Sequence, residues 1–138
     1  MKRTNPFQAF LFLIAGGIFL VAMILTYQDT SDFLQSSSVA NGKVTELNHG
    51  SSHPEIEFTT QSGEKISYPQ GGFIFGMSVG DEVSVRYLAD APRRTARLDQ
   101  FGSMWFWTLA TAMFAIVFLA IGIVSLRQAL MGRQKEEQ

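Results

Sequence analysis

The stretch that decides the fold runs from Phe7 to Tyr27 and reads FQAFLFLIAGGIFLVAMILTY. It contains no charged residue, and as a helix it would be about 31 Å long, which matches a hydrocarbon core of about 30 Å. A second uncharged stretch lies near the other end of the chain, at residues 105–126. The sequence therefore predicts two transmembrane helices, at residues 7–27 and 105–126, that form a helical hairpin.

Two alternatives to transmembrane helices fit these stretches less well. They are buried helices of a soluble protein and, for the first stretch, a cleaved signal peptide. A chain of 138 residues is too short to wrap two helices that are apolar on all sides, which disfavours a soluble core. A signal peptide has an apolar core of about 7–15 residues, followed closely by a cleavage site. The first stretch is longer, and the small-residue sequence Ser38-Val39-Ala40 lies well beyond it. We therefore expect an uncleaved anchor.

The charges outside the stretches predict the orientation. Lys2 and Arg3 make the N-terminal tip basic, residues 127–138 have a net charge of +1, and residues 28–104 have a net charge of −4. Cytoplasmic loops and tails of membrane proteins carry an excess of Lys and Arg. We therefore expect a multi-pass protein of a bacterial inner membrane, with cytoplasmic N and C termini, a cytoplasmic tail at residues 127–138 and residues 28–104 in the periplasm.

Residues near the ends of the stretches are expected to meet the membrane surface. Amphipathic aromatic rings favour the lipid–water interface, and arginines there can serve as anchors or can bind anionic head groups. Three arginines on the periplasmic side run against the charge rule, but a segment longer than about 60 residues is translocated largely regardless of charge. The predicted interface anchors are Tyr27, Arg93, Arg94, Arg97, Trp105 and Trp107.

Apolar and polar residues alternate between the two stretches. Ile56 and Phe58 share one face and Glu55 and Glu57 the other, which is typical of a strand that covers a core. Strands are expected at residues 39–47, 55–60, 64–68, 82–88 and 95–98. The pattern predicts a membrane α+β fold, in which two transmembrane helices flank a small five-stranded antiparallel, barrel-like β domain at residues 39–98. Residues 28–38 are expected to be a linker or a short extension of the first helix.

Composition excludes several classes of function. Too few residues remain between the stretches for a multidomain enzyme with its own large cleft. With a net charge of −1, the chain lacks the positive charge that is typical of nucleic-acid-binding proteins. The absence of cysteine excludes disulfides and thiolate sites. Ser51 and Ser52 next to histidines do not make a hydrolase, because an oriented base and an oxyanion pocket are also required. We expect no enzymatic activity, no catalytic residue and no cofactor.

Two histidines are weak candidates for metal ligands. His49 and His53 precede Glu55 and Glu57, and imidazole and carboxylate groups together can hold zinc or copper. The sequence contains no third histidine, and the glutamates alternate onto the water face of the expected strand. A solvated turn is therefore the favoured interpretation.

Two further sets of residues are candidates for contacts. Large apolar side chains crowd the connection before the fourth strand and cannot all face one core, so we expect a lid on the barrel, a lipid contact or a partner contact at Phe73, Ile74, Phe75 and Met77. Small residues let helix backbones approach closely. Packing between the two helices, with a second copy or with a helix of another protein, is expected at Gly16, Gly17, Thr108, Ala112, Ala115 and Gly122.

The chain resembles a family of bacterial membrane proteins that is catalogued as a domain of unknown function. The resemblance is carried by Ala40-x-Gly42-x-Val44, Pro54-x-Ile56-x-Phe58-x-Thr60-x-x-Gly63, Gly80-Asp81-x-Val83-x-Val85-x-Tyr87, Pro92 and Ala96-x-Leu98. It implies two transmembrane helices around a small extracytoplasmic β domain and brings no catalytic residues. The sequence departs from the family at Ala89-Asp90-Ala91 and in the first, histidine-bearing loop.

Together these features predict a non-catalytic protein of the cell envelope that binds a protein partner through a strand edge or the Phe73–Met77 segment. The first alternative is an immunity protein against a secreted toxin, because some small two-span proteins of this kind resemble immunity proteins. The second alternative is a metal sensor or enzyme that uses His49 and His53. The expected partners are the lipid bilayer, one protein and, in one interpretation, a second copy of the chain.

Overall fold

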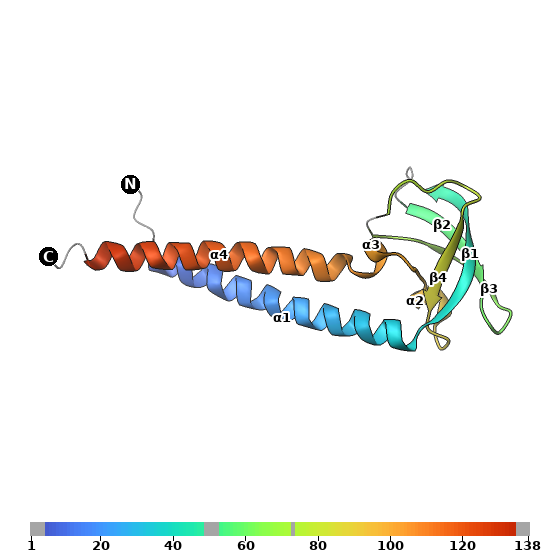
Figure 1. Cartoon of the computed structure of the whole chain (residues 1–138), viewed down its shortest axis with the longest axis horizontal. Helices are drawn as coiled ribbons and strands as arrows, with labels where there is room; N and C mark the ends of the chain where they lie inside the picture. The colour runs from blue at the N-terminus through green and yellow to red at the C-terminus, as the bar shows by residue number, and fades with distance from the viewer. Residues whose placement is uncertain (1–4, 49–52, 73, 135–138) are drawn as a thin grey trace. The chain divides into compact units, whose positions relative to one another are not determined.

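The computed structural model describes residues 5–48, 53–72 and 74–134, and Figure 1 shows the order of the elements. The chain forms two compact units. The first consists of Met1–Tyr27 and Trp107–Gln138, and the second of Gln28–Phe106. The first unit is helical and the second contains a sheet, and each is described below by itself.

The first unit contains most of two long helices, α1 (Pro6–Ser36) and α4 (Phe106–Gln134). Pro6 starts α1, where its missing N–H costs little, and the Asn5 Oδ1 accepts a hydrogen bond of 3.1 Å from the Phe7 N–H. Both helices are long and apolar enough to cross a membrane, and only 11% of each apolar window is buried. Apolar side chains such as those of Ile18 and Ile116 are therefore exposed in this unit.

The two helices approach each other closely at two glycines, Gly16 and Gly122. A Cβ atom added to Gly16 would lie 2.6 Å from the Leu119 Cγ, and one added to Gly122 would lie 2.8 Å from the Leu13 Cδ2. Without these Cβ atoms, each leucine side chain packs directly on the backbone of the opposite helix. Stacked rings extend the contact, in the pairs Phe12–Phe118, Phe19–Phe114 and Phe19–Phe118.

The other small residues of the two helices differ in their surroundings. Ala115 and Thr108 are buried, and Ala112 is half-buried. Nothing lies within 4 Å of a Cβ atom added to Gly17, since consecutive residues of a helix point about 100° apart. Gly17 therefore lies off the helix contact, although it follows Gly16 directly.

This difference predicts the effect of one methyl group. We expect Gly16→Ala to weaken the association of the helices by about 1–2 kcal/mol relative to Gly17→Ala, because only the first methyl group meets Leu119. Both substitutions raise helix propensity equally, so that their difference isolates packing. Titration of the full chain from mild detergent into dodecyl sulfate, followed by circular dichroism, measures it. Coincident transitions of the two variants would contradict this packing.

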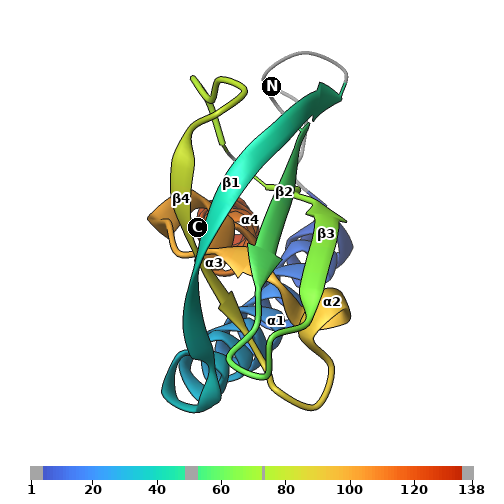
Figure 2. The same ribbon diagram turned by 90° about the vertical axis from the view of Figure 1, so that its right-hand side faces the viewer.

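The second unit is built on a five-stranded antiparallel sheet in the order β3-β2-β1-β4-β5. The strand β1 is central and long, pairing with β4 over Ser38–Lys43 and with β2 over Gly42–Asn48, and its register shifts between Val44 and Glu46. Such a shift bends a strand, and the sheet curls into a half-barrel (Figure 2). The strands are β1 (Ser38–Asn48), β2 (His53–Thr59), β3 (Lys65–Pro69), β4 (Glu82–Tyr87) and β5 (Arg97–Leu98).

This architecture confirms the predicted fold class, with differences in local bounds. Residues 28–36, expected as a linker or extension, continue α1. The last expected strand, at residues 95–98, is shorter, because Thr95 ends the helical turn α2 (Pro92–Thr95). A further short helix, α3 (Phe101–Met104), precedes α4.

The core of the second unit lies on the concave side of the sheet. It contains the alternate residues of the strands together with two residues of the β3–β4 connection, and Phe58 packs against Tyr68 and Tyr87 with ring centroids 5.9 and 5.2 Å apart. The buried core residues are Val44, Ile56, Phe58, Ile66, Tyr68, Ile74, Met77, Val85, Tyr87 and Leu98.

A buried glutamine links the two outer strands of the sheet. Gln70 follows β3, and its Oε1 accepts hydrogen bonds from the Leu98 N–H of β5 at 2.7 Å and from the Tyr68 hydroxyl at 2.9 Å. Its Nε2 donates to the Gly71 carbonyl at 2.6 Å and to the Ser103 hydroxyl at 3.0 Å. One side chain thus joins the strand β3 to β5 and α3, where no backbone ladder pairs the two outer strands among the described residues.

The Tyr68 hydroxyl predicts a loss of stability in alkali. Burial raises its pKa well above its ordinary value of about 10. Above about pH 10 the unfolded chain releases the Tyr68 proton, while the folded chain retains it. The stability that the protonated Tyr68 hydroxyl contributes is therefore complete below about pH 10 and is lost as the pH rises. We expect the free energy of unfolding of the second unit to fall by about 1.4 kcal/mol more per pH unit above about pH 10 than it does in Tyr68→Phe. Urea unfolding in detergent at pH 8–11 measures this, and parallel pH profiles would contradict it.

Candidate binding face of the second unit

The outward side of the sheet is polar, because the strands alternate. On β2, for example, Ile56 and Phe58 are buried while Glu55 and Glu57 are half-exposed. The outer face is defined by the outward side chains of β1–β4, which are the apolar Val39 and the polar Asn41, Lys43, Glu46, Glu55, Glu57, Thr59, Lys65, Ser67, Glu82, Ser84 and Arg86. The alternation of Glu55 and Glu57 in the sequence already predicted this exposure.

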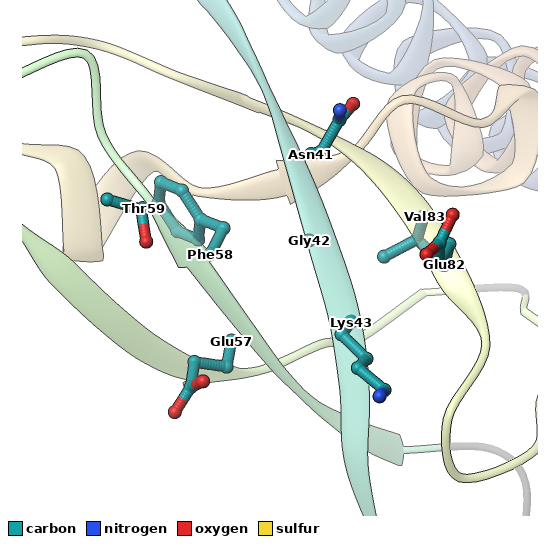
Figure 3. A pocket seen from close by; sticks show the side chains of 8 residues that line it. All are labelled: Asn41, Gly42, Lys43, Glu57, Phe58, Thr59, Glu82 and Val83. Atoms are coloured by element: carbon teal, nitrogen blue, oxygen red, sulfur yellow. The ribbon is translucent and has the colours of Figure 1, made fainter. Parts of the chain in front are cut away.

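A hollow of about 400 Å³ opens on the sheet where β1 changes partner. Gly42 lies at this point and pairs with Phe58 of β2 and Val83 of β4. Figure 3 shows Lys43 on the central strand, between Glu57 on one neighbouring strand and Glu82 on the other. The lining residues are Asn41, Gly42, Lys43, Glu57, Phe58, Thr59, Glu82 and Val83.

The sheet and its connections are acidic. Residues 38–88 contain six carboxylate side chains and three cationic ones. Lys65 pairs with Glu57 at 2.8 Å, but Lys65 is exposed and Glu57 half-exposed, and such a surface pair contributes only about 0–1 kcal/mol. A cationic group of a partner can therefore displace Lys65 from Glu57 at small cost. The charge and the hollow suit a partner with a basic, protruding side chain.

The predicted interface arginines have different environments. Arg93 and Arg94 are exposed on α2. Arg97 is half-buried, and its guanidinium lies 4.7 Å from the centroid of the buried Phe33 ring. Arg97 therefore takes part in the packing of the second unit, where a cation over an aromatic face is stabilising.

The predicted interface aromatics also differ. Tyr27 and Trp107, which belong to the first unit, have exposed side chains, and Trp105 of the second unit is half-buried.

The Phe73–Met77 segment is divided between core and surface. Ile74 and Met77 are 2% and 8% exposed and belong to the core. Phe75, between them, is 72% exposed. Phe73 lies outside the described residues. Burial of two of the three described side chains agrees with the expected lid, and the exposed Phe75 is the remaining contact candidate.

The metal candidates receive no geometric support. His49 lies outside the described residues, and His53 is exposed at the start of β2. Among residues 5–48, 53–72 and 74–134, no group of three or more His, Cys, Asp or Glu side chains is placed to hold a metal ion.

Two features of this unit were not predicted from the sequence. The hollow depends on the pairing of β1 with both neighbours, which no local pattern reveals. The role of Gln70 also depends on distant residues, although a polar side chain directly after a strand and before two glycines was a usable signal.

Comparison with known proteins identifies a relative that indicates the class of protein to which the chain belongs. No family model matches the chain, and no solved structure matches it. The resemblance to a family of unknown function therefore stays a prediction. The chain is 44% identical over 119 residues to a bacterial immune protein, in an alignment that covers 86% of this chain and 74% of that relative.

The relative is the immune protein Tsi4 of Pseudomonas aeruginosa, and at this identity and coverage the chain belongs to the Tsi4 family. This similarity favours the immunity alternative over the more general role of an envelope accessory protein.

Proposed function

We propose that this chain is an immunity protein, a non-catalytic membrane protein that binds a toxin in the cell envelope and neutralises it. The observation that carries the proposal is the 44% identity to an immune protein over most of both chains. The geometry is compatible with it, because the second unit offers an acidic, hollowed face. A binding role also requires no catalytic group.

We further propose that α1 and α4 cross the inner membrane, with both termini in the cytoplasm and the second unit in the periplasm. The length, apolar surface and low burial of the helices support the insertion. The basic tips and the acidic middle segment support the orientation. Association between copies through the small residues of the helices stays a prediction.

The proposal is tested by competition between sister cells. A strain that lacks this chain but can still receive the toxin should lose in mixed culture on a solid surface against its parent. A plasmid copy of the chain should restore its survival. Equal survival of the deletion strain, under conditions in which the parent delivers its toxins, would contradict the proposal.

The outer face predicts which residues protection needs. We expect Glu57→Lys/Glu82→Lys to weaken toxin binding at least about tenfold, or about 1.4 kcal/mol, because two repulsive charges replace two attractive ones beside the hollow. Glu64→Lys/Asp90→Lys makes the same change in net charge at exposed positions outside the hollow. Survival in the competition assay, at equal membrane abundance, compares the pairs. Equal protection by both would place the toxin contact elsewhere.

A further inference from the structure

One side of the second unit is defined by the points where the chain enters and leaves it. The unit begins at Gln28 of α1 and ends at Phe106 of α4. Close to these points, the Thr30 hydroxyl donates a hydrogen bond of 3.4 Å to the Met104 carbonyl. The entry and exit of the chain therefore lie together on one side of the unit, the exit side, which is marked by Thr30 and Met104.

The β3–β4 connection is fixed to the exit side. The Gln70 Nε2 donates a hydrogen bond of 3.0 Å to the Ser103 hydroxyl of α3. Gly72 has a φ of +101°, and a Cβ atom added to it would lie 3.5 Å from the Gly102 carbonyl oxygen and from the Ser103 Cα. The connection thus packs against α3, which ends two residues before α4 begins.

Two exposed phenylalanines lie on these neighbouring segments. Ile74 and Met77 point into the core, and Phe75 between them is 72% exposed. Phe101, the first residue of α3, is 67% exposed. No charged residue occurs in the sequence between Gln70 and Gly80, or between Gln100 and Leu126. Covering these rings with apolar material would therefore bury no charge of either segment.

We propose that Phe75 and Phe101 insert into the outer leaflet of the bilayer and hold the exit side on the lipid surface. This inference rests on the proposed insertion of α4. Ser103 is three residues from Phe106, so the chain holds it within about 11 Å of the start of that helix. The connection that carries Phe75 is bound to Ser103, so it too is confined near the interface. Because this surface is covalently continuous with α4, lipid is favoured over a protein as the material that covers Phe75 and Phe101.

The absence of cysteine makes a direct test practical. Single cysteines replace Phe75 and Phe101, each in its own variant, and carry a nitroxide label. The full chain is reconstituted into vesicles of phosphatidylethanolamine and phosphatidylglycerol. Collision rates with oxygen, which concentrates in lipid, and with a water-soluble nickel chelate then report the surroundings of each label. A label at Ser62, in the exposed β2–β3 turn, is the water control, and one at Ile116 of α4 is the lipid control.

We expect an oxygen-to-nickel ratio at Phe75 and Phe101 that is several-fold higher than at Ser62. Water-like ratios at both positions, with a lipid-like ratio at Ile116, would overturn the inference and leave the insertion of α4 intact. A water-like ratio at Ile116 would overturn the insertion itself, and the inference with it. Spin–spin broadening between labels at Phe75 would show a second copy covering the surface, which also contradicts it. Because both phenylalanines are exposed, we expect the labelled variants to fold. If one variant does not fold, the label at the other position still tests the inference.

Discussion

Replacing Gln70 by leucine is expected to lower the free energy of unfolding of the second unit by about 2–5 kcal/mol. The Leu98 N–H and the Tyr68 hydroxyl both donate to the Gln70 Oε1, and leucine removes this acceptor without opening the site to water. A buried donor that loses its partner costs about 1–3 kcal/mol. The substitution also removes the hydrogen bond to Ser103, so that β3 loses its link to α3.

Hydrogen exchange of the full chain in lipid nanodiscs measures the effect. Backbone amides of β3 and of residues 97–104 should lose protection in Gln70→Leu, while the amides of α4 keep theirs. Gln61→Leu is the matched control, because its side chain is exposed and the hydrogen bond from its backbone N–H to the Tyr87 hydroxyl is kept. Equal protection in the two variants would show that Gln70 does not join the outer strands.

Local patterns were sufficient to predict most of the fold. The uncharged stretches predict α1 and α4, because about 20 consecutive apolar residues make a helix long enough to cross a hydrocarbon core. The alternation around Ile56 and Phe58 predicts a half-buried strand, and the structure pairs it as β2 with β1 and β3. The helical residues 28–36 were harder to assign, since a polar, serine-rich segment fits a linker as well as a helix.

Contacts between distant residues could not be predicted in the same way. The apolar character of Ile74 and Met77 gave no sign of whether core, lipid or a partner would cover them, and the structure buries both in the core. The hollow lies where Gly42 pairs with both Phe58 and Val83, and locating it requires the register of two strand pairs. The function is harder to predict than these contacts, because a fold does not specify a binding partner. The proposal of an immunity role therefore rests on the similarity to Tsi4.

Gly42→Val is expected to destabilise the second unit by about 3 kcal/mol, at the upper end of what overpacking costs. A Cβ atom at Gly42 would lie 2.9 Å from the Val85 Cγ2, 3.1 Å from the Glu57 carbonyl oxygen and 3.2 Å from the Ile56 Cγ2. The carbonyl oxygen belongs to the sheet backbone and cannot move without disturbing the pairing of β1 with β2. Valine is favoured over glycine in strands, so any loss of stability arises from the lack of space.

The same substitution separates membrane insertion from protection. Gly42 belongs to the second unit, so we expect Gly42→Val still to sediment with membranes and to keep the exchange protection of α4. Amides of β1, β2 and β4 should lose protection, and the deletion strain carrying this variant should lose in competition as if it carried no copy. Gly71→Val is the control, because nothing lies within 4 Å of a Cβ atom at Gly71. If Gly42→Val protected cells fully while the sheet amides exchanged freely, the folded second unit could not be the toxin-binding element, and the helices would have to carry that function.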